Sequence, residues 1–306
     1  MSFSNCGLRT ANYKLGGIAH WVWFLLFWTI TPLFAETPSP SEPPKRIISM
    51  APNLTEMVYD IGASEQLVGV TDFCKFPPAA KSKARVGGWI NPSYEKILSL
   101  KTDLVLALQF HGQTVDNLKR LKIPLLVLDC QTVQDILNAY DTLGKKLGHE
   151  ADAKRGKAAL EKRLAKARAR AKKHKPVSVL FVIGHNPGTL EQLYGVGPKN
   201  FVDELITLAG GVNILADAHE PYPLVSKEQL LKRDPDIIID SLPSSETSAR
   251  ELKPVRESWK KLSSLKAVRE NRVYTLTTDE YLIPGPTMAG LAEYLSNLFQ
   301  KISKKP

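Results

Sequence analysis

Residues 91–106 read Asn91-Pro-Ser-Tyr-Glu-Lys-Ile-Leu-Ser-Leu-Lys-Thr-Asp-Leu-Val-Leu106, and the fold can be predicted outward from them. A related stretch returns at 224–239, Leu224-Val-Ser-Lys-Glu-Gln-Leu-Leu-Lys-Arg-Asp-Pro-Asp-Ile-Ile-Ile239. In both copies a serine stands two positions before a glutamate, and an aspartate eight positions after that glutamate opens an aliphatic run. Each copy therefore predicts a short capped helix that leads into a buried strand of a parallel sheet.

Two copies so far apart predict two lobes built alike, because the period is too long for a solenoid. Around them, strand patterns alternate with helix patterns, which is typical of parallel sheets covered on both faces. We expect an α/β fold of two Rossmann-like lobes joined by one long connector helix, with a ligand cleft between the lobes. Individual helices are predicted over Val133–Leu147 and Trp259–Val268.

The connector is predicted from a change in pattern at residue 150. Residues 150–174 lack proline, and alanine, lysine and arginine dominate them. This gives an N-terminal lobe over 45–149, a connector helix over 150–174 and a C-terminal lobe over 175–306. The formal net charge is +10, and a basic connector could bind nucleic acid or a membrane. We prefer a solvated outer helix face, since the chain has no DNA- or RNA-binding signature.

The first 44 residues have the pattern of an export signal. Arg9 and Lys14 precede an apolar run that ends at Ala35, and a Pro/Ser-rich segment follows. We predict a signal peptide over 1–35 and a flexible tail over 36–44; the alternative is an uncleaved membrane anchor. Export would place Cys74 and Cys130 in an oxidising compartment, where they could form a disulfide, and the sequence leaves this open.

Aromatic residues gather in the loops where an open α/β sheet binds its ligand. Trp89 and Tyr222 stand before the equivalent helices of the two copies, an arrangement that suits clamping a flat, partly apolar ligand. Further aromatic residues in these loops are Phe73, Phe76, Phe110 and Tyr281.

The same loops contain histidines and carboxylates that could carry chemistry. His111, His185 and His219 leave open an exported histidine-based metalloenzyme. Against it, no Gly-x-Ser-x-Gly elbow is present, and Asp279 and Glu280 have no evident acid–base partner. We therefore expect no catalytic residues, no resident metal site and no cofactor.

Glu95 and Glu228 occupy the first helical turn of the two copies. Carboxylates favour helix N-termini, which alone explains one glutamate. A matched pair, one in each lobe, favours a shared outer role: gripping two basic residues of a symmetric partner.

Four segments resemble one protein class. They are Arg46-Ile-Ile-Ser-Met-Ala-Pro-Asn-Leu-Thr-Glu56, Val86-Gly-Gly-Trp-Ile-Asn-Pro-Ser-Tyr-Glu95 with Asp103-Leu-Val, Tyr222-Pro-x-Val-Ser-x-Glu228, and Thr277-Thr-Asp279. Across residues 45–303 the chain resembles the periplasmic ABC-importer binding proteins that carry cobalamin, haem and ferric siderophores. The match is nearest to the cobalamin-binding members.

This resemblance implies a non-enzymatic, monomeric periplasmic receptor that carries a corrinoid as transported ligand. It places corrin contacts at Phe73, Trp89 and Tyr222 and a polar contact at Asp279. His185 joins them as a candidate ligand contact, in a loop that departs from the family pattern. Glu95 and Glu228 would dock onto arginines of the dimeric permease. The alternative ligand is haem or a ferric siderophore, although the loops lack the arginine cluster that anionic chelates usually require.

Overall fold

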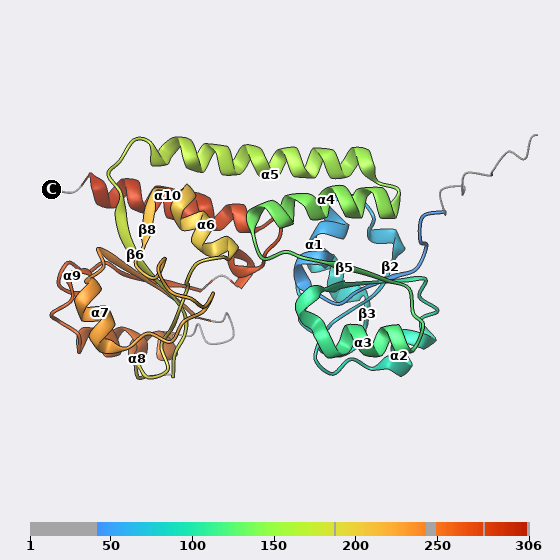
Figure 1. The fold of residues 1–306 in the computed structure, drawn as a ribbon, viewed down its shortest axis with the longest axis horizontal. Coiled ribbons are helices and arrows are strands. Elements are labelled where there is room, and N and C mark those ends of the chain that lie inside the picture. The colour runs from blue at the N-terminus through green and yellow to red at the C-terminus, as the bar shows by residue number, and fades with distance from the viewer. Residues whose placement is uncertain (1–41, 187, 243–248, 278, 305–306) are drawn as a thin grey trace, which may run out of the picture. The chain divides into compact units, whose positions relative to one another are not determined.

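The computed structural model describes residues 42–186, 188–242, 249–277 and 279–304, without the side chains of 249–253 and 279. The signal peptide expected over 1–35, its alternative as an anchor, and most of the tail lie outside these residues. In the described part of the chain, no helix is both long and apolar enough to cross a membrane. The described residues all belong to one compact unit, Glu42–Pro306, which contains two α/β lobes (Figure 1).

The N-terminal lobe is built on a sheet in the order β3-β2-β1-β4-β5, in which every neighbouring pair is parallel. The strands are β1 (Ile47–Ser49), β2 (Leu67–Val70), β3 (Ala84–Arg85), β4 (Leu104–Leu108) and β5 (Leu125–Leu128). The inner strands β1 and β4 are buried along their whole length. Their aliphatic composition is the one that a strand covered on both faces requires.

The helices of this lobe are α1 (Pro52–Asp60), α2 (Tyr94–Ser99), α3 (Gly112–Arg120) and α4 (Val133–Leu147). The helix predicted over 133–147 is confirmed as α4. It begins with a capping box, because Thr132 accepts a hydrogen bond from the Asp135 amide at 3.1 Å and the Asp135 carboxylate accepts one from the Thr132 amide at 3.0 Å. It ends at Gly148, whose φ of 78° lies in the left-handed region that glycine favours.

The C-terminal lobe has the sheet order β10-β9-β6-β7, with β8 also paired to β6. Strand β6 (Val177–Gly184) carries two short strands on one edge: parallel β8 (Gly211–Asn213) along its first half and antiparallel β7 (Tyr194–Gly195) along its second. On its other side lie β9 (Ile237–Ser241) and then β10 (Val273–Leu276), both parallel. The sequence did not predict β7 or β8 as strands.

The helices of this lobe are α6 (Phe201–Leu208), α7 (Lys227–Arg233), α8 (Ala249–Lys260), α9 (Lys266–Arg269) and α10 (Met288–Ser303). The helix predicted over 259–268 is wrong. Trp259 belongs to the end of α8, and two successive turns, closed by Leu262 N–Trp259 O and Leu265 N–Leu262 O bonds, precede α9. Trp259 of α8 and Leu265, the residue before α9, bury their side chains in one core, which imitated a single apolar helix face in the sequence.

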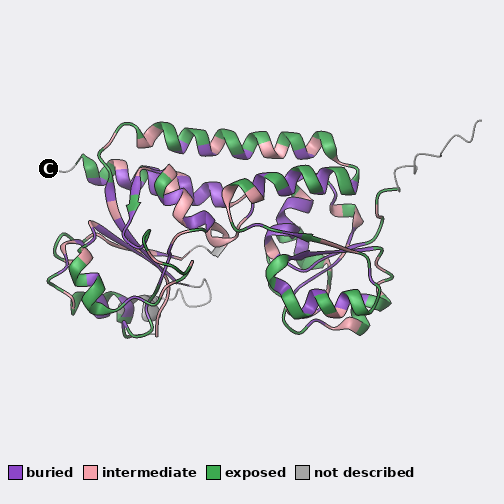
Figure 2. Ribbon diagram, viewed as in Figure 1, coloured by how far each residue is buried: buried purple, intermediate pink, exposed green. Residues whose placement is uncertain are grey.

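Helix α5 (Glu150–Ala171) confirms the connector helix predicted over 150–174 and ends three residues earlier. It packs on α4 of the first lobe and on α10 of the second (Figure 1). Only a narrow seam is buried, and the remaining surface faces outward (Figure 2). Arg163 forms two 3.0 Å bonds to Glu293 of α10, and Lys157 binds Asp141 of α4 at 2.6 Å. The helix is thus tied to both lobes.

The lobes also meet at a second place. Asn53 Nδ2 donates to the Pro284 carbonyl at 3.2 Å, and Thr287 Oγ1 donates to Glu56 Oε2 at 2.8 Å. Asn53 comes shortly after β1 and Pro284 follows β10, so the carboxyl ends of the two sheets lie toward the place where the lobes meet. Burial raises the pKa of Glu56, which is only 4% exposed, to about 7.

Cys74 and Cys130 are both buried and both free, so the disulfide that the sequence left open is not formed in this structure. The Cys74 sulfur instead lies 3.2 Å from Thr55 Oγ1 and 3.1 Å from Thr71 Oγ1.

Candidate functional site

The strand orders create one crevice position in each sheet. From β1 the chain passes to β2 on one side, and β4 lies on the other; from β6 it passes to β8 on one side, and β9 lies on the other. Ligands of open α/β sheets bind outside the carboxyl ends of strands at such a reversal. The loops that follow these strands, together with those entering α2 and α7, are therefore where a site is expected.

Trp89 lies at this edge of the N-terminal lobe in an aromatic cluster. Its ring stacks on the His111 imidazole, with centroids 5.1 Å apart and an interplanar angle of 19°, and meets Phe110 edge-on at 5.4 Å. Thr114 Oγ1 donates to the Trp89 carbonyl at 2.7 Å and holds its backbone. Phe110 is 60% exposed and Phe73, in the loop after β2, is 56% exposed. The cluster thus presents aromatic surface to the outside.

His111 supports Trp89 as a neutral ring. Its Nδ1 accepts a hydrogen bond from the Leu108 amide at 3.3 Å, so that nitrogen carries no proton. The residue is 3% exposed, and burial lowers its pKa to about 4. At neutral pH the imidazole is therefore uncharged where it stacks on the Trp89 ring.

Tyr222 is the corresponding exposed aromatic of the C-terminal lobe, at 47% exposure. The prolines on either side of it accept backbone hydrogen bonds from the β7 region: Gly195 N donates to Pro223 O at 3.0 Å, and Gly197 N donates to Pro221 O at 2.8 Å. The backbone around Tyr222 is therefore held on both sides of the exposed ring.

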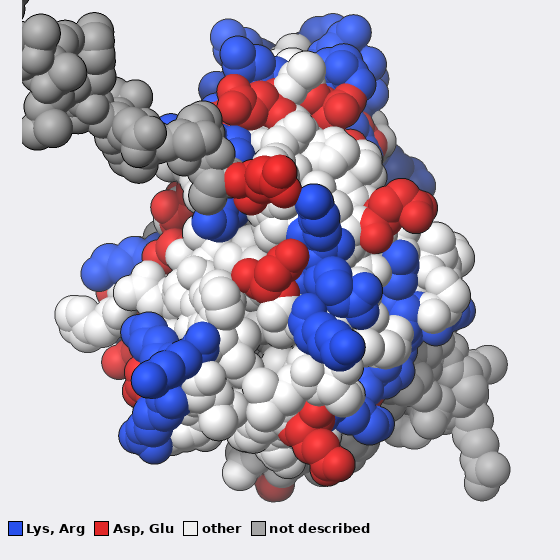
Figure 3. Space-filling view, turned by 90° about the vertical axis from the view of Figure 1, so that its right-hand side faces the viewer, with Lys and Arg blue, Asp and Glu red and all other residues white. Residues whose placement is uncertain are grey.

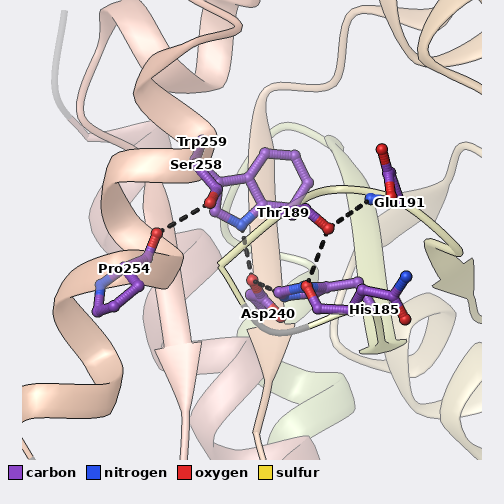
Figure 4. Close-up of polar contacts among 8 residues, drawn as sticks. His185, Thr189, Glu191, Asp240, Pro254, Ser258 and Trp259 are labelled. Atoms are coloured by element: carbon purple, nitrogen blue, oxygen red, sulfur yellow. Dashed lines mark hydrogen bonds and ion pairs between the residues drawn. The ribbon is translucent and has the colours of Figure 1, made fainter.

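His185, directly after β6, points toward Asp240 of β9 (Figure 4). Its side chain is 0% exposed, with Nδ1 3.0 Å from Asn186 O and Nε2 3.1 Å from Asp240 Oδ2. Trp259 Nε1 donates to the same Asp240 oxygen at 2.6 Å. Burial alone would lower the pKa of His185, but the hydrogen bond and charge of Asp240 outweigh burial and raise it. With both nitrogens engaged, this geometry does not support His185 as a direct ligand contact.

Glu95 and Glu228 occupy the second position of α2 and α7, and both are exposed. The helices begin alike, because Ser93 Oγ accepts from the Lys96 amide and Ser226 Oγ accepts from the Gln229 amide. Neither glutamate forms an ion pair with any described residue. Figure 1 shows α2 and α7 on the side of their sheets away from α5.

An exposed leucine accompanies each glutamate. Leu98 is 52% exposed and Leu231 is 44% exposed, while the preceding Ile97 and Leu230 are fully buried. Residues three apart share a face of a helix, so each leucine adjoins its glutamate.

The two copies correspond without a gap. Tyr222 follows Trp89 by 133 positions, and the same offset joins Glu228 to Glu95 and the first residue of β9 to that of β4. The predicted equivalence of the lobes thus extends from the aromatic residue through the helix to the strand.

The three loop histidines are not brought together. Among the described residues, no group of three or more His, Cys, Asp or Glu side chains could hold a metal ion. His111 is packed in one lobe, His185 is bonded in the other, and His219 is exposed. The metalloenzyme alternative therefore has no metal centre in the described part of the chain. Asp279 begins a short 3-10 turn, but its side chain lies outside the described residues.

Charge is mixed on the end of the N-terminal lobe. On the face shown in Figure 3, lysine and arginine are interspersed with aspartate and glutamate and do not merge into one basic area. On α5 itself, Arg163 and Lys157 bind acidic residues of neighbouring helices. These observations give no support to a nucleic-acid-binding role.

A family model described as periplasmic binding protein matches residues 47–280. The chain belongs to the periplasmic binding protein family. It is similar to the vitamin B12-binding proteins of Pectobacterium atrosepticum, at 32% identity over 64% of this chain and 71% of the relative, and of Yersinia pestis, at 30% identity over 66% and 71%.

Solved structures of the same family have the same fold. The periplasmic vitamin B12 binding protein BtuF of Vibrio cholerae gives a TM-score of 0.73 at 27% identity, covering 86% of this chain and 99% of that one. The periplasmic heme-binding protein RhuT of Roseiflexus sp. RS-1 gives 0.72 at 25% identity, covering 85% and 99%. The bilobal α/β architecture is thereby confirmed, as is membership of a class of substrate-binding proteins associated with ABC transport. In this class vitamin B12 is a transported ligand and not a cofactor.

Sequence reasoning found the exposed aromatics but missed the residues behind them. Asp240 and Trp259 were not singled out, although an aspartate inside the run Ile237-Ile-Ile-Asp240 is an unusual charge in a buried strand. An aspartate in a buried strand needs a hydrogen-bonding partner, so this residue could have indicated a polar group at the end of β9.

Proposed function

We propose that this protein captures a corrinoid between its two lobes and delivers it to an ABC importer in the inner membrane. The observation that carries the proposal is a pair of aromatic sites at equivalent positions of the two lobes: half-buried Trp89 with exposed Phe110 in one, and exposed Tyr222 in the other. Large apolar side chains left exposed at matched sites favour a ligand-binding surface. The vitamin B12-binding relatives support a corrinoid as the ligand.

A corrinoid fits these side chains because it is large, flat and partly apolar. Phe73 and Trp89 would contact it from the first lobe and Tyr222 from the second, with Asp279 as the proposed polar contact. Aromatic faces bury much area at low conformational cost. In this proposal His185 supports the second lobe's surface from below.

The outer surface would dock onto the permease. Exposed carboxylates on equivalent helices suit a two-fold partner that offers one arginine to each lobe, since arginine binds carboxylates through paired hydrogen bonds. We propose Glu95 and Glu228 for this contact. A monomeric receptor presents both copies at once, and size-exclusion chromatography with light scattering checks its monomeric state.

Export through a signal peptide over residues 1–35 completes the proposal. The mass of the protein purified from the periplasm tests it directly: cleavage after Ala35 removes those residues, whereas an uncleaved anchor retains them in the membrane fraction.

The deciding experiment is a titration of the purified protein with cobalamin and, separately, with haem, followed by tryptophan quenching and calorimetry. The double variant W89A/Y222A should bind cobalamin at least about 100-fold more weakly, since two aromatic contacts are each worth about 1.5–3 kcal/mol. The same variant should still bind permease-containing membranes. Unchanged affinity for cobalamin in W89A/Y222A would contradict the hypothesis that Trp89 and Tyr222 hold the ligand between them.

The matched variant is E95K/E228K, which should leave cobalamin affinity unchanged and abolish docking and transport. Transport that survives this double reversal would contradict the docking role. Because the two variants fail in opposite assays, they separate capture from delivery.

Haem is the second candidate ligand. A haem-binding neighbour shares the fold at 25% identity, and the segment 219–222 exposes both an imidazole and a phenol, two side chains that bind haem iron. Haem binding would give a Soret shift that is lost in Tyr222→Phe or His219→Gln. If the protein is a cobalamin receptor and does not ligate haem iron, neither substitution should change its haem spectrum.

A further inference from the structure

The buried group formed by His185, Asp240 and Trp259 lies at the strand reversal of the C-terminal lobe, and the proposed contacts do not use it. Its geometry determines where the protons lie. Asn186 O is a carbonyl and can only accept, so His185 Nδ1 must donate to it. Asp240 Oδ2 already accepts from Trp259 at 2.6 Å, which favours the ionised carboxylate. His185 Nε2 then donates as well, and the ring carries both protons.

The described residues of the loop that starts at His185, which leave out position 187, are bonded to one another. The Asn186 amide donates to Glu191 O at 2.9 Å and the Thr189 amide donates to Asn186 O at 3.1 Å. Gly188 turns the chain with a φ of 73°, which lies in the left-handed region. The imidazolium holds this loop at Asn186 and fastens it to β9 through Asp240 (Figure 4).

The same loop continues into the segment that holds Tyr222. The Val225 amide donates to Leu193 O at 2.8 Å, Gly195 donates to Pro223 O and Gly197 donates to Pro221 O. We define residues 193–197 with 221–225 as the tyrosine strap. Its first strand emerges from the loop anchored by His185, so a change at the anchor is passed along the backbone to both sides of Tyr222.

We propose that the doubly protonated His185, held by Asp240, is a positioning residue that fixes the tyrosine strap and makes ligand retention dependent on pH. The effect on ligand affinity rests on the proposed function, whereas the role of His185 in fixing the tyrosine strap does not. When His185 loses a proton, a nitrogen lone pair faces the carboxylate and the anchor weakens. Affinity for a ligand held by Tyr222 then falls as pH rises through the raised pKa of His185.

The groups that face the ring are few. From β9 there is Asp240, from α8 Trp259, and from its own loop Asn186 and Thr189. Among these described neighbours Asp240 is the one acidic side chain, so the pH response is that of His185 facing a single carboxylate.

The first test needs no variant and no ligand. The imidazole signals of the purified protein are followed by NMR from pH 5 to 9, with His185 assigned through His185→Gln. The inference requires His185 to be protonated at both nitrogens at neutral pH and to titrate above its ordinary value. A His185 ring that is neutral at pH 7 would overturn it.

The second test measures hydrogen exchange of the strap amides of Gly195, Gly197 and Val225. In His185→Gln their protection should fall about tenfold, which is the effect of losing one charge-assisted hydrogen bond. The amides of Asp72 and Ser93, which bond to Gly87 O and Val86 O beside Trp89, serve as internal controls and should not change. His149→Gln, at the far end of α5, is the control variant. Unchanged strap amides in His185→Gln, or equal loss in both lobes, would contradict the inference.

The last test joins the strap to the ligand. Cobalamin affinity of the wild-type protein should fall about tenfold between pH 6 and pH 9, and His185→Gln should bind with the weaker affinity at both values. A pH-independent wild-type affinity would disprove the effect on the ligand. If the protein binds no cobalamin at any pH, the proposed function fails, while the NMR and exchange results still decide the role of His185.

Discussion

His111 lies against Trp89 in the N-terminal lobe and His185 follows β6 in the C-terminal lobe, and the two imidazoles have different hydrogen-bond partners. His111 accepts a hydrogen bond from the Leu108 amide, and burial lowers its pKa to about 4. His185 donates from both nitrogens, and although burial opposes it, Asp240 raises its pKa. The difference comes from one partner: a backbone amide facing the first ring, a carboxylate facing the second.

The contrast separates the features that the two similar lobes share from those in which they differ. The outer helices carry a glutamate and a leucine at the same offset, as the proposed contact with one two-fold partner requires. The strand ends have diverged. In the N-terminal lobe hydroxyls and a thiol fill the buried space, as Thr55 Oγ1 donates to Ser49 Oγ at 2.9 Å beside Cys74. In the C-terminal lobe the buried polar group at the strand ends is the His185–Asp240 pair.

The two histidines should give opposite slopes of stability against pH. His185, with its raised pKa, adds stability that is fully present below its unfolded value and is lost as pH rises through the folded pKa. His111, with its lowered pKa, costs stability as pH falls from about 6.5 toward 4, because the unfolded chain takes up the proton first.

Asp240→Asn is expected to have the largest effect, since it leaves the buried imidazolium without its counter-charge. We expect a loss of about 3–5 kcal/mol in the free energy of unfolding. The matched change in the neutral network, Thr55→Val, should cost only about 1 kcal/mol. Urea unfolding of both variants and of the wild type at pH 7 measures these two losses in the free energy of unfolding. Equal losses would show that the C-terminal network is no more charged than the N-terminal one.

Glu56→Gln should remove a third pH-dependent contribution to stability, which would otherwise hide the contributions of the two histidines. The folded pKa of Glu56, about 7, lies above its unfolded value of 4.5, so the wild-type protein loses stability as pH rises from 4.5 to 7. A glutamine can still accept the Thr287 hydroxyl hydrogen bond. The variant should match the wild type at pH 4 and exceed it by about 3 kcal/mol at pH 8. Thermal unfolding across that range checks this, and a variant less stable at pH 8 would refute it.

His111→Phe should sharpen the comparison at acid pH. The phenyl ring can still stack on Trp89, but the buried Leu108 amide loses its acceptor, which costs about 1–3 kcal/mol at pH 7. The acid decline between pH 6.5 and 4 should become shallower, because a phenyl ring cannot be protonated. Denaturant midpoints measured on the Glu56→Gln background isolate this effect. An acid decline as steep as before would assign it to another group.

The sequence predicted the features that repeat or follow a local rule. The helix and strand of each copy, the connector helix and the exposed positions of Glu95 and Glu228 follow from hydrophobic pattern and capping signals, which act over a few residues. The aromatic positions Trp89 and Tyr222 follow from their place before equivalent helices.

What the sequence could not show depends on contacts through space. Nothing near His185 indicates that Asp240 lies against it, and Trp259 was assigned to the wrong helix because its burial imitates the apolar face of the next one. The strand β7, of two residues, is too short to show a period. It forms because Leu224, 30 residues from Tyr194, and the prolines beside Tyr222 offer it backbone partners.

The smallest effects are expected where the two lobes are most alike. Leu98→Ser and Leu231→Ser change half-exposed side chains, so the free energy of unfolding should move by no more than about 0.5 kcal/mol. If each leucine packs against the permease beside its glutamate, each variant should weaken docking by about 1 kcal/mol, or about fivefold, with cobalamin affinity unchanged. Leu121→Ser, at 44% exposure but without a neighbouring docking glutamate, is the matched control. Equal losses of docking affinity in the Leu98 and Leu231 variants would mean that the permease contacts both copies in the same way. A loss confined to one lobe would contradict a two-fold contact. A loss as large in the Leu121 control would contradict it as well.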